Sequence, residues 1–218
     1  LLMGSMVEQI VTDAVQSLKE RDVRKAWAAY DEDQAINDKR FALENAIVTV
    51  IATQQPMAHD IRALAAMLEV ISELERMGDY GKGISKTVIR LGSTEVPVPY
   101  REIDEMLEQA VSMLHRGLSA FVSENANLAA ALWREDDQVD DLYNRVYHLM
   151  IAHMIQDPSI TDPASLILWV AHNLERFADR VTNICERTVY SVTGELLEFE
   201  GSDDEDLPRS GEGESPAG

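Results

Sequence analysis

The chain has 218 residues, 45% of them apolar, and it carries a formal net charge of −20 at pH 7. This apolar fraction is enough for a packed core and excludes a globally disordered chain. An excess of negative charge this large is repelled by nucleic acid and by anionic lipid, so neither is expected as a direct partner. The length allows one large domain or two domains of about 100 residues each.

Cysteine content and the lengths of the apolar runs predict a soluble protein of the cytoplasm. The single cysteine, Cys185, excludes an internal disulfide framework and fits a reducing compartment. No apolar run approaches the roughly 20 residues that a membrane-spanning helix needs, so no membrane insertion is expected. No secretory signal is recognisable either. The chain starts in a helical pattern without an initiator methionine, and we expect residues to be missing upstream of Leu1.

Apolar residues recur with helical spacing along most of the chain and predict six helices, with no convincing strand. The expected helices cover residues 2–19, 23–53, 57–91, 101–123, 126–156 and 163–198. Pro56 ends the second helix, and the stretch Gly92–Tyr100 is a linker between two halves. Asp22, Asn125 and Asp162 each precede a helix, and we expect their side chains to cap its first turn.

The predicted fold is all-α, with two tandem three-helix bundles and a disordered acidic C-terminal tail. The first bundle covers residues 1–92 and the second covers residues 101–200. The tail, residues 201–218, has six acidic residues and one arginine and is rich in Gly, Ser and Pro. This composition cannot bury enough apolar surface to fold.

A six-residue pattern occurs twice and relates the two halves. Leu74–Asp79 reads Leu-Glu-Arg-Met-Gly-Asp, and Leu174–Asp179 reads Leu-Glu-Arg-Phe-Ala-Asp, 100 positions later. In the preceding helix of each half, an offset of 103 residues matches Asp33 with Asp136. Self-similarity of this kind indicates two copies of one three-helix unit.

The repeated acids could form one oxygen-rich cluster in each half. The Glu and Asp of each repeated stretch lie one helical turn apart on the same face. Antiparallel middle and last helices would place further acids opposite them. Carboxylates bind Mg²⁺, Mn²⁺, iron and zinc and can bridge several ions. The candidate metal ligands are Asp33, Glu75, Asp79, Asp136, Asp140, Glu175 and Asp179. Asn37 is neutral where the second half has Asp140, so the first site is expected to be partial.

Other interpretations of these acids remain open from the residues alone. A Glu-x-x-x-Asp pair can be an ordinary solvated helix face. Arg76 and Arg176 could also neutralise acids on neighbouring helices, which would give a metal-free helical scaffold. A carboxylate-bridged metalloenzyme is a further alternative, although it needs an open coordination position and a substrate cavity. The sequence contains no recognisable phosphate-binding loop, catalytic triad order, His-Glu-x-x-His or Cys-x-x-Cys motif, so we do not expect an enzyme.

The remaining reactive and aromatic residues are interpreted as structural. His172 precedes Glu175 by three positions, but a ferritin-like di-iron centre needs Glu-x-x-His twice and in the opposite order. His172 is therefore expected on the surface or partly buried. Cys185 is interpreted as a small packing residue rather than a nucleophile. Trp27 and Trp133 are expected in the core.

Four segments of the chain resemble, in order and spacing, the sequence elements of one known family. Gln54–Arg62 resembles the element "QQPVAxDLR", and Glu73–Asp79 resembles "eLERiGD". Val139–Tyr143 resembles "iDxLY", and Leu174–Tyr190 resembles the second copy of "eLERiGD" with the residues that follow it, except that Ala178 and Arg180 replace the usual Gly and His. The family is that of the PhoU accessory regulators of phosphate transport, and the resemblance covers about residues 1–198.

This resemblance implies a non-enzymatic, often homodimeric protein of two similar three-helix bundles that binds multinuclear iron or zinc clusters. It implies the ligands Asp33, Glu75 and Asp79 in one unit, and in the other unit Asp136, Asp140, Glu175 and Asp179. It also implies contacts in the cytoplasm with the ATPase subunit of the phosphate ABC transporter and with a sensor histidine kinase. Through these contacts the phosphate regulon would be kept off when phosphate is plentiful.

Overall fold

The computed structural model describes residues 1–195, and these residues are helical almost throughout, without a strand. The elements are α1 (Leu2–Glu20), α2 (Val23–Gln54), α3 (His59–Leu91), α4 (Tyr100–Val122), α5 (Ala126–Leu132), the 3₁₀ turn η1 (Trp133–Glu135), α6 (Asp136–Gln156), the 3₁₀ turn η2 (Pro158–Ile160) and α7 (Thr161–Thr193). The all-α prediction is confirmed. Within residues 1–195, no helix is long and apolar enough to cross a membrane.

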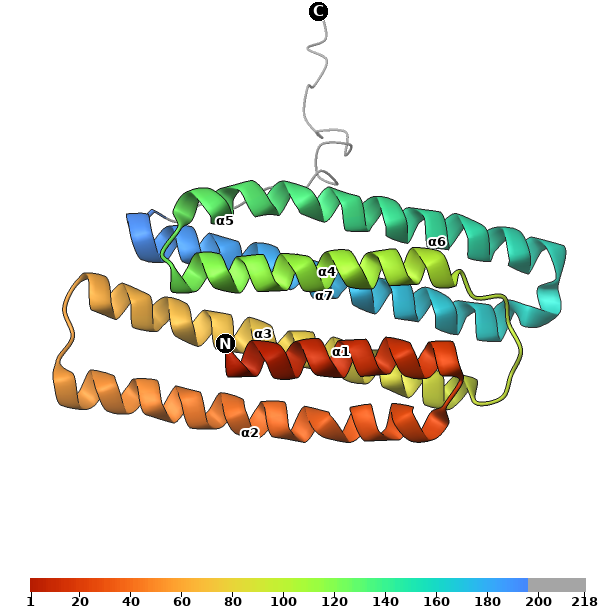
Figure 1. Cartoon of the computed structure of the whole chain (residues 1–218), viewed down its shortest axis with the longest axis horizontal. Helices are drawn as coiled ribbons and strands as arrows, with labels where there is room; N and C mark the ends of the chain where they lie inside the picture. Colours follow the sequence, from red (N-terminus) through yellow and green to blue (C-terminus); the bar gives the residue numbers. More distant parts are fainter. Residues whose placement is uncertain (196–218) are drawn as a thin grey trace, which may run out of the picture.

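The helices form two three-helix layers that lie against each other and are shifted along the long axis, so that each layer extends beyond the other at one end (Figure 1). α1, α2 and α3 form one layer, and α4, the α5–α6 segment and α7 form the other. Successive helices run antiparallel, and the segment between α3 and α4 connects the layers at one end (Figure 1). The most extensive helix contact of all joins α3 to α7 across the layers.

A single apolar core extends through both layers. α1 contributes a buried stripe at the spacing that one helical face requires, including Val7, Ile10, Val11 and Ala14. Residues of α4 and α7 with the same spacing continue this cluster without a break. The two sequence repeats therefore share one apolar core and are not separate domains joined by a linker.

Two of the three predicted helix caps are confirmed. The Asp22 carboxylate accepts a hydrogen bond from the backbone N–H of Arg24 at 2.9 Å, at the start of α2. The Asn125 side chain accepts from the backbone N–H of Leu128 at 3.0 Å, at the start of α5. Both contacts satisfy donors that a helix start leaves without partners.

The predicted cap at Asp162 is wrong, because the helix start lies further upstream. Pro158 begins the turn η2, which leads directly into α7, so Asp162 lies inside the first turn of the helix. Asp157 takes the capping role, and its Oδ1 accepts from the backbone N–H of Ser159 at 3.0 Å. At the other end, α7 stops at Thr193 before the left-handed Gly194, so the predicted extension to residue 198 is not seen within the described residues. The predicted tail, residues 201–218, lies outside them.

Two further sequence expectations differ from the structure. Trp27 was expected in the core but is 49% exposed, because it lies on the outer side of α2 and packs only edge-on against Tyr30. The predicted fifth helix is split by η1, which separates α5 from α6 directly before Asp136. Trp133, in that turn, is half-buried.

Glycines on α3 allow three helices to approach it closely. A Cβ at Gly78 would lie 2.9 Å from Ile36 of α2, and one at Gly81 would lie 2.9 Å from the side chain and 3.2 Å from the backbone of α1. A Cβ at Gly83 would lie 2.8 Å from Asn173 of α7. The close approach of α2 at Gly78 brings its acids opposite Glu75 and Asp79.

Replacing Gly81 with alanine tests this packing through the sign of the effect. In an open helix, Gly→Ala stabilises by about 1 kcal/mol. Here the added Cβ meets the backbone of α1, and we expect Gly81→Ala to destabilise the fold by roughly 1–3 kcal/mol. Urea unfolding followed by circular dichroism measures the difference. A stabilised variant would show that α1 does not approach α3 as described.

Candidate metal centres

The antiparallel arrangement predicted for the acid-bearing helices is present in both layers. α2 runs antiparallel to α3, and α6 runs antiparallel to α7 (Figure 1). This creates two groups of side chains at matching places in the two repeats. We call Asp33, Asn37, Glu75 and Asp79 the first cluster, and Asp136, Asp140, Glu175 and Asp179 the second cluster.

In the second cluster the four predicted carboxylates come together. Burial raises the pKa of Asp136 to about 8, with further contributions from the negative charges of Asp179, Asp140 and Glu175. Burial also raises the pKa of Asp179, against the opposing effect of Arg180 and of a hydrogen bond with Asp136. The neighbouring acids thus oppose ionisation of the largely buried Asp136, and a positive charge at this place would favour its ionised form.

One oxygen of Asp136 indicates how a cation would fit the second cluster. Its Oδ1 is buried and has no hydrogen-bond partner within residues 1–195. Buried polar atoms are almost always satisfied, and an orphaned carboxylate oxygen among other carboxylates is a good ligand for a hard or borderline cation. Within the same residues, no three Asp, Glu, His or Cys side chains already stand in a ready-made coordination geometry. The chemistry of the donor set in the second cluster thus suits a metal ion, although these side chains do not stand in a coordination geometry in this structure.

The turn η1 fixes the start of α6 and so the position of Asp136. Glu135, the last residue of the turn, accepts a short hydrogen bond of 2.6 Å from Arg116 of α4. This ion pair ties the turn to the neighbouring helix. The sequence analysis missed it, because the apolar spacing of residues 126–156 continues across the break.

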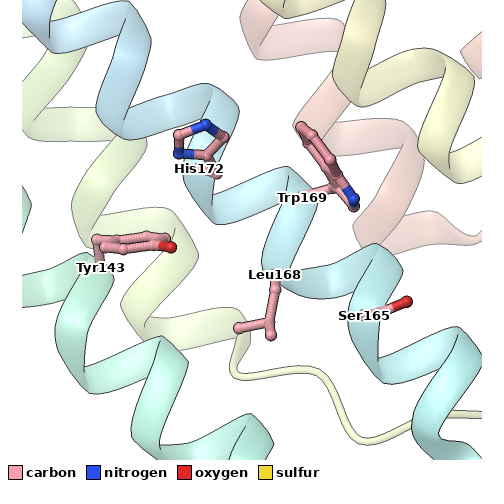
Figure 2. A pocket seen from close by; sticks show the side chains of 5 residues that line it. All are labelled: Tyr143, Ser165, Leu168, Trp169 and His172. Atoms are coloured by element: carbon pink, nitrogen blue, oxygen red, sulfur yellow. The ribbon is translucent and has the colours of Figure 1, made fainter.

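His172 lies closer to the site than the sequence suggested. Its Nδ1 lies 3.2 Å from Oε2 of Glu175, which is a close contact between the ring and one of the predicted ligands. Figure 2 shows its ring beside a cavity of about 210 Å³ that is lined by Tyr143, Ser165, Leu168, Trp169 and His172. Burial lowers the pKa of His172, and nearby Arg176 lowers it further, which favours the neutral ring at neutral pH. Its partly buried position agrees with the prediction.

The first cluster differs because two cations lie among its acids. Asp33 is buried, and its Oδ2 contacts Nζ of Lys82 at 2.7 Å. Arg40 contacts Glu75 at 3.0 Å. Burial raises the pKa of Asp79, as do the charges of Asp33 and Glu75, whereas Lys82 and Arg40 oppose the shift. The first cluster thus contains its three predicted acids and, beside them, the positive side chains of Lys82 and Arg40.

A polar contact connects the two repeats between the clusters. Glu73 of α3 is buried and accepts hydrogen bonds from Arg180 at 3.4 Å and from Asn183 at 3.2 Å, both on α7. Arg76 pairs with Glu73 within α3 at 2.9 Å. The guanidinium of Arg176 lies over the ring of Tyr80 of α3, 5.3 Å from its centre. Arg180 therefore stands between a buried acid of one repeat and the candidate ligands of the other.

Cys185 is fully buried, and burial raises the pKa of its thiol to about 12. A thiol in this environment stays protonated and is a poor nucleophile. The interpretation of Cys185 as a packing residue agrees with this position.

The fold and the clusters define a class of protein: two fused three-helix repeats, each with acids of a middle helix facing acids of a last helix. The chain belongs to the PhoU domain family, whose model matches residues 1–88 and 103–188. The two matched segments correspond to the two layers of the structure.

Relatives match the chain over nearly its full length. The "Phosphate-specific transport system accessory protein PhoU homolog" of Clostridium acetobutylicum is 34% identical over 200 residues, covering 91% of both chains. The PhoU accessory protein of Escherichia coli is 31% identical, covering 94% of this chain and 86% of its own. Among solved structures, PhoU from Streptococcus pneumoniae matches with a TM-score of 0.84 and 32% identity, covering 90% of this chain and 93% of its own. PhoU from Pseudomonas aeruginosa matches with a TM-score of 0.83 and 31% identity, covering 89% and 94%.

The raised pKa of Asp136 gives a pH-dependent stability with a defined sign. Because the pKa of about 8 in the folded protein lies above the ordinary aspartate pKa of 3.8, ionisation of Asp136 lowers the stability of the fold as the pH rises between these two values. In chelator-treated protein at pH 8, we expect Asp136→Asn to be more stable than the wild type by on the order of 1–3 kcal/mol. The difference should shrink towards pH 4, where the wild-type carboxyl is protonated.

Urea unfolding at pH 8, 6 and 4 measures this difference. Asp137→Asn, an exposed neighbour on the same helix, is the matched control and should change stability little. Equal stability of the wild type and Asp136→Asn at pH 8 would contradict the burial of a charged cluster at this place.

Proposed function

We propose that the protein is an accessory regulator of a phosphate-specific transport system and acts through protein contacts rather than catalysis. The observation that carries this proposal is the match to proteins named phosphate-specific transport system accessory proteins across both repeats and nearly the whole chain. Its proposed partners are the ATPase subunit of the phosphate ABC transporter and a sensor histidine kinase, met in the cytoplasm. It would act as a negative regulator of the phosphate regulon, as a homodimer.

The charge of the chain supports partners with basic surfaces. A net charge of −20 produces a long-range field that speeds encounters with positive surfaces and disfavours acidic ones. The buried thiol of Cys185 leaves no nucleophile at that position for covalent catalysis. A protein that acts through protein contacts does not need such a nucleophile.

The second cluster is the proposed metal centre, with iron or zinc as the metal and several ions bridged by its carboxylates. The would-be ligands are Asp136, Asp140, Glu175 and Asp179. The buried, unpartnered Oδ1 of Asp136 supports this assignment. A bound cation would neutralise the acids between α6 and α7 and so hold the two helices together. His172 lies beside this cluster, with its Nδ1 3.2 Å from Oε2 of Glu175.

The enzyme alternative finds less support around this cluster. The cavity beside His172 measures about 210 Å³. Substrate and ligand pockets usually have volumes of about 300–1,000 Å³. The adaptor proposal requires no such pocket.

Deletion of the gene in its own host tests the regulatory proposal. In phosphate-replete medium, we expect the deletion strain to express phosphate-starvation genes and to take up phosphate faster, because the repressing contact is lost. A reporter fusion and radiolabelled phosphate uptake measure the two effects, and the wild-type gene supplied on a plasmid should reverse them. Unchanged reporter and uptake in the deletion strain would refute the proposal.

Elemental analysis tests the metal centre. We expect purified protein to bind iron or zinc and Asp136→Asn with Asp140→Asn to lose at least half of it. The matched control is Asp137→Asn with Asp141→Asn, since these acids follow the candidate ligands on α6 but are exposed. The control should keep the wild-type metal content. If both double variants bind as much metal as the wild type, the assignment to the second cluster is wrong.

A further inference from the structure

The first cluster contains two positively charged side chains among its acids, and in this respect the two repeats differ. We propose that Lys82 and Arg40 permanently supply the first cluster with positive charge, so that metal binding is confined to the second cluster. On this view the first repeat keeps its acid-bearing helices together without metal, and only the second repeat responds to metal supply. The inference rests on the proposed metal binding of the second cluster.

Lys82 is the first of these internal cations. Its Nζ lies 2.7 Å from Oδ2 of Asp33, whose side chain is only 3% exposed. The ammonium also lies 5.0 Å from the centre of the Tyr30 ring, a favourable cation–π position. A buried carboxylate and an aromatic face thus hold a fixed positive charge inside the cluster.

Arg40 is the second internal cation. Its Nη1 contacts Oε1 of Glu75 at 3.0 Å, and its Nε donates to Glu44 at 2.8 Å. One guanidinium therefore neutralises Glu75 from the facing helix. Arginine stays protonated at any physiological pH, so this charge cannot be removed by deprotonation to admit a metal ion.

Asn37 further reduces the capacity of the first cluster to bind a metal ion. Its side-chain amide donates to Oδ2 of Asp33 at 3.1 Å, the same oxygen that contacts Lys82. That oxygen is therefore engaged by two donors. The other oxygen of Asp33, Oδ1, has no hydrogen-bond partner within residues 1–195, but a divalent ion at Oδ1 would be repelled by the adjacent ammonium.

The second repeat has different residues at the matching positions. The sequence offsets between the repeats, 103 residues for the middle helix and 100 for the last, relate Asn37 to Asp140, Arg40 to Tyr143 and Lys82 to Thr182. Neither internal cation is thus reproduced, and the second cluster has an additional acid. Arg180 lies 3.7 Å from Asp179, but it also contacts the buried Glu73 of the other repeat.

A swap of three residues tests the inference by gain of binding. Asn37→Asp, Arg40→Tyr and Lys82→Thr copy the second repeat into the first, and they are combined in one triple variant. All proteins are loaded with Zn²⁺ alone, desalted and measured by elemental analysis. We expect the Asp136→Asn and Asp140→Asn double variant to bind almost no Zn²⁺, and the same double variant to regain binding when the triple swap is added.

A second measurement covers the case in which the triple variant does not fold. In chelator, we expect Lys82→Thr alone to lower the unfolding temperature by several degrees, because Asp33 then keeps a buried charge without its partner. Zn²⁺ should raise the unfolding temperature of Lys82→Thr further than that of the wild type. Lys86→Thr, a substitution of the same type one turn later on α3, is the control for the helix effect of threonine.

The outcomes separate this inference from the proposed function. If the Asp136→Asn and Asp140→Asn double variant keeps about half of the wild-type Zn²⁺ and Asp33→Asn removes that part, the first cluster binds metal and the inference is overturned. If the wild type binds no metal, the proposed metal centre fails, and the confinement of metal to the second cluster fails with it. The compensation of Asp33 by Lys82 is then judged separately: it holds if Lys82→Thr lowers the unfolding temperature in chelator, and it is overturned if the temperature is unchanged.

Discussion

Carboxylates that are packed between helices need positive charge among them, and this requirement shapes both halves of the molecule. Burial raises the cost of ionising such an acid, and each neighbouring acid raises it further, as the pKa of about 8 for Asp136 illustrates. The first repeat meets the requirement with an ammonium and a guanidinium that approach from neighbouring helix positions. The second repeat has no residues of that kind at the same positions, and its acids fit an external cation. One inherited arrangement thus allows two physical solutions.

The shared core connects the two clusters, so a change at one cluster can affect the other. α3 and α7 form the most extensive helix contact, and each carries part of one cluster. Arg180 reaches from the second cluster to the buried Glu73 of α3, and Arg176 stacks on Tyr80 beside Asp79. Any rearrangement of α7 when a cation enters the second cluster would act directly on these contacts.

Much of this architecture could be predicted from the sequence, because it depends on local periodicity. The helices follow from apolar spacing, the caps at Asp22 and Asn125 follow from the chemistry of one turn, and the antiparallel facing of the acids follows from the repeat. Features that depend on distant contacts could not be predicted. The pairing of Asp33 with Lys82 joins two different helices, and the exposure of Trp27 depends on which side of α2 remains uncovered. The break at η1 gave no signal, since the apolar pattern continues through it.

The central claim is that a cation from outside serves the second cluster and Lys82 serves the first. Anomalous diffraction from crystals of the zinc-loaded protein, measured on both sides of the zinc absorption edge, tests it most directly. The account predicts anomalous peaks among Asp136, Asp140, Glu175 and Asp179, with no peak between Asp33 and Asp79 and with Lys82 still in contact with Asp33. A zinc peak in the first cluster, with Lys82 displaced from Asp33, would contradict it.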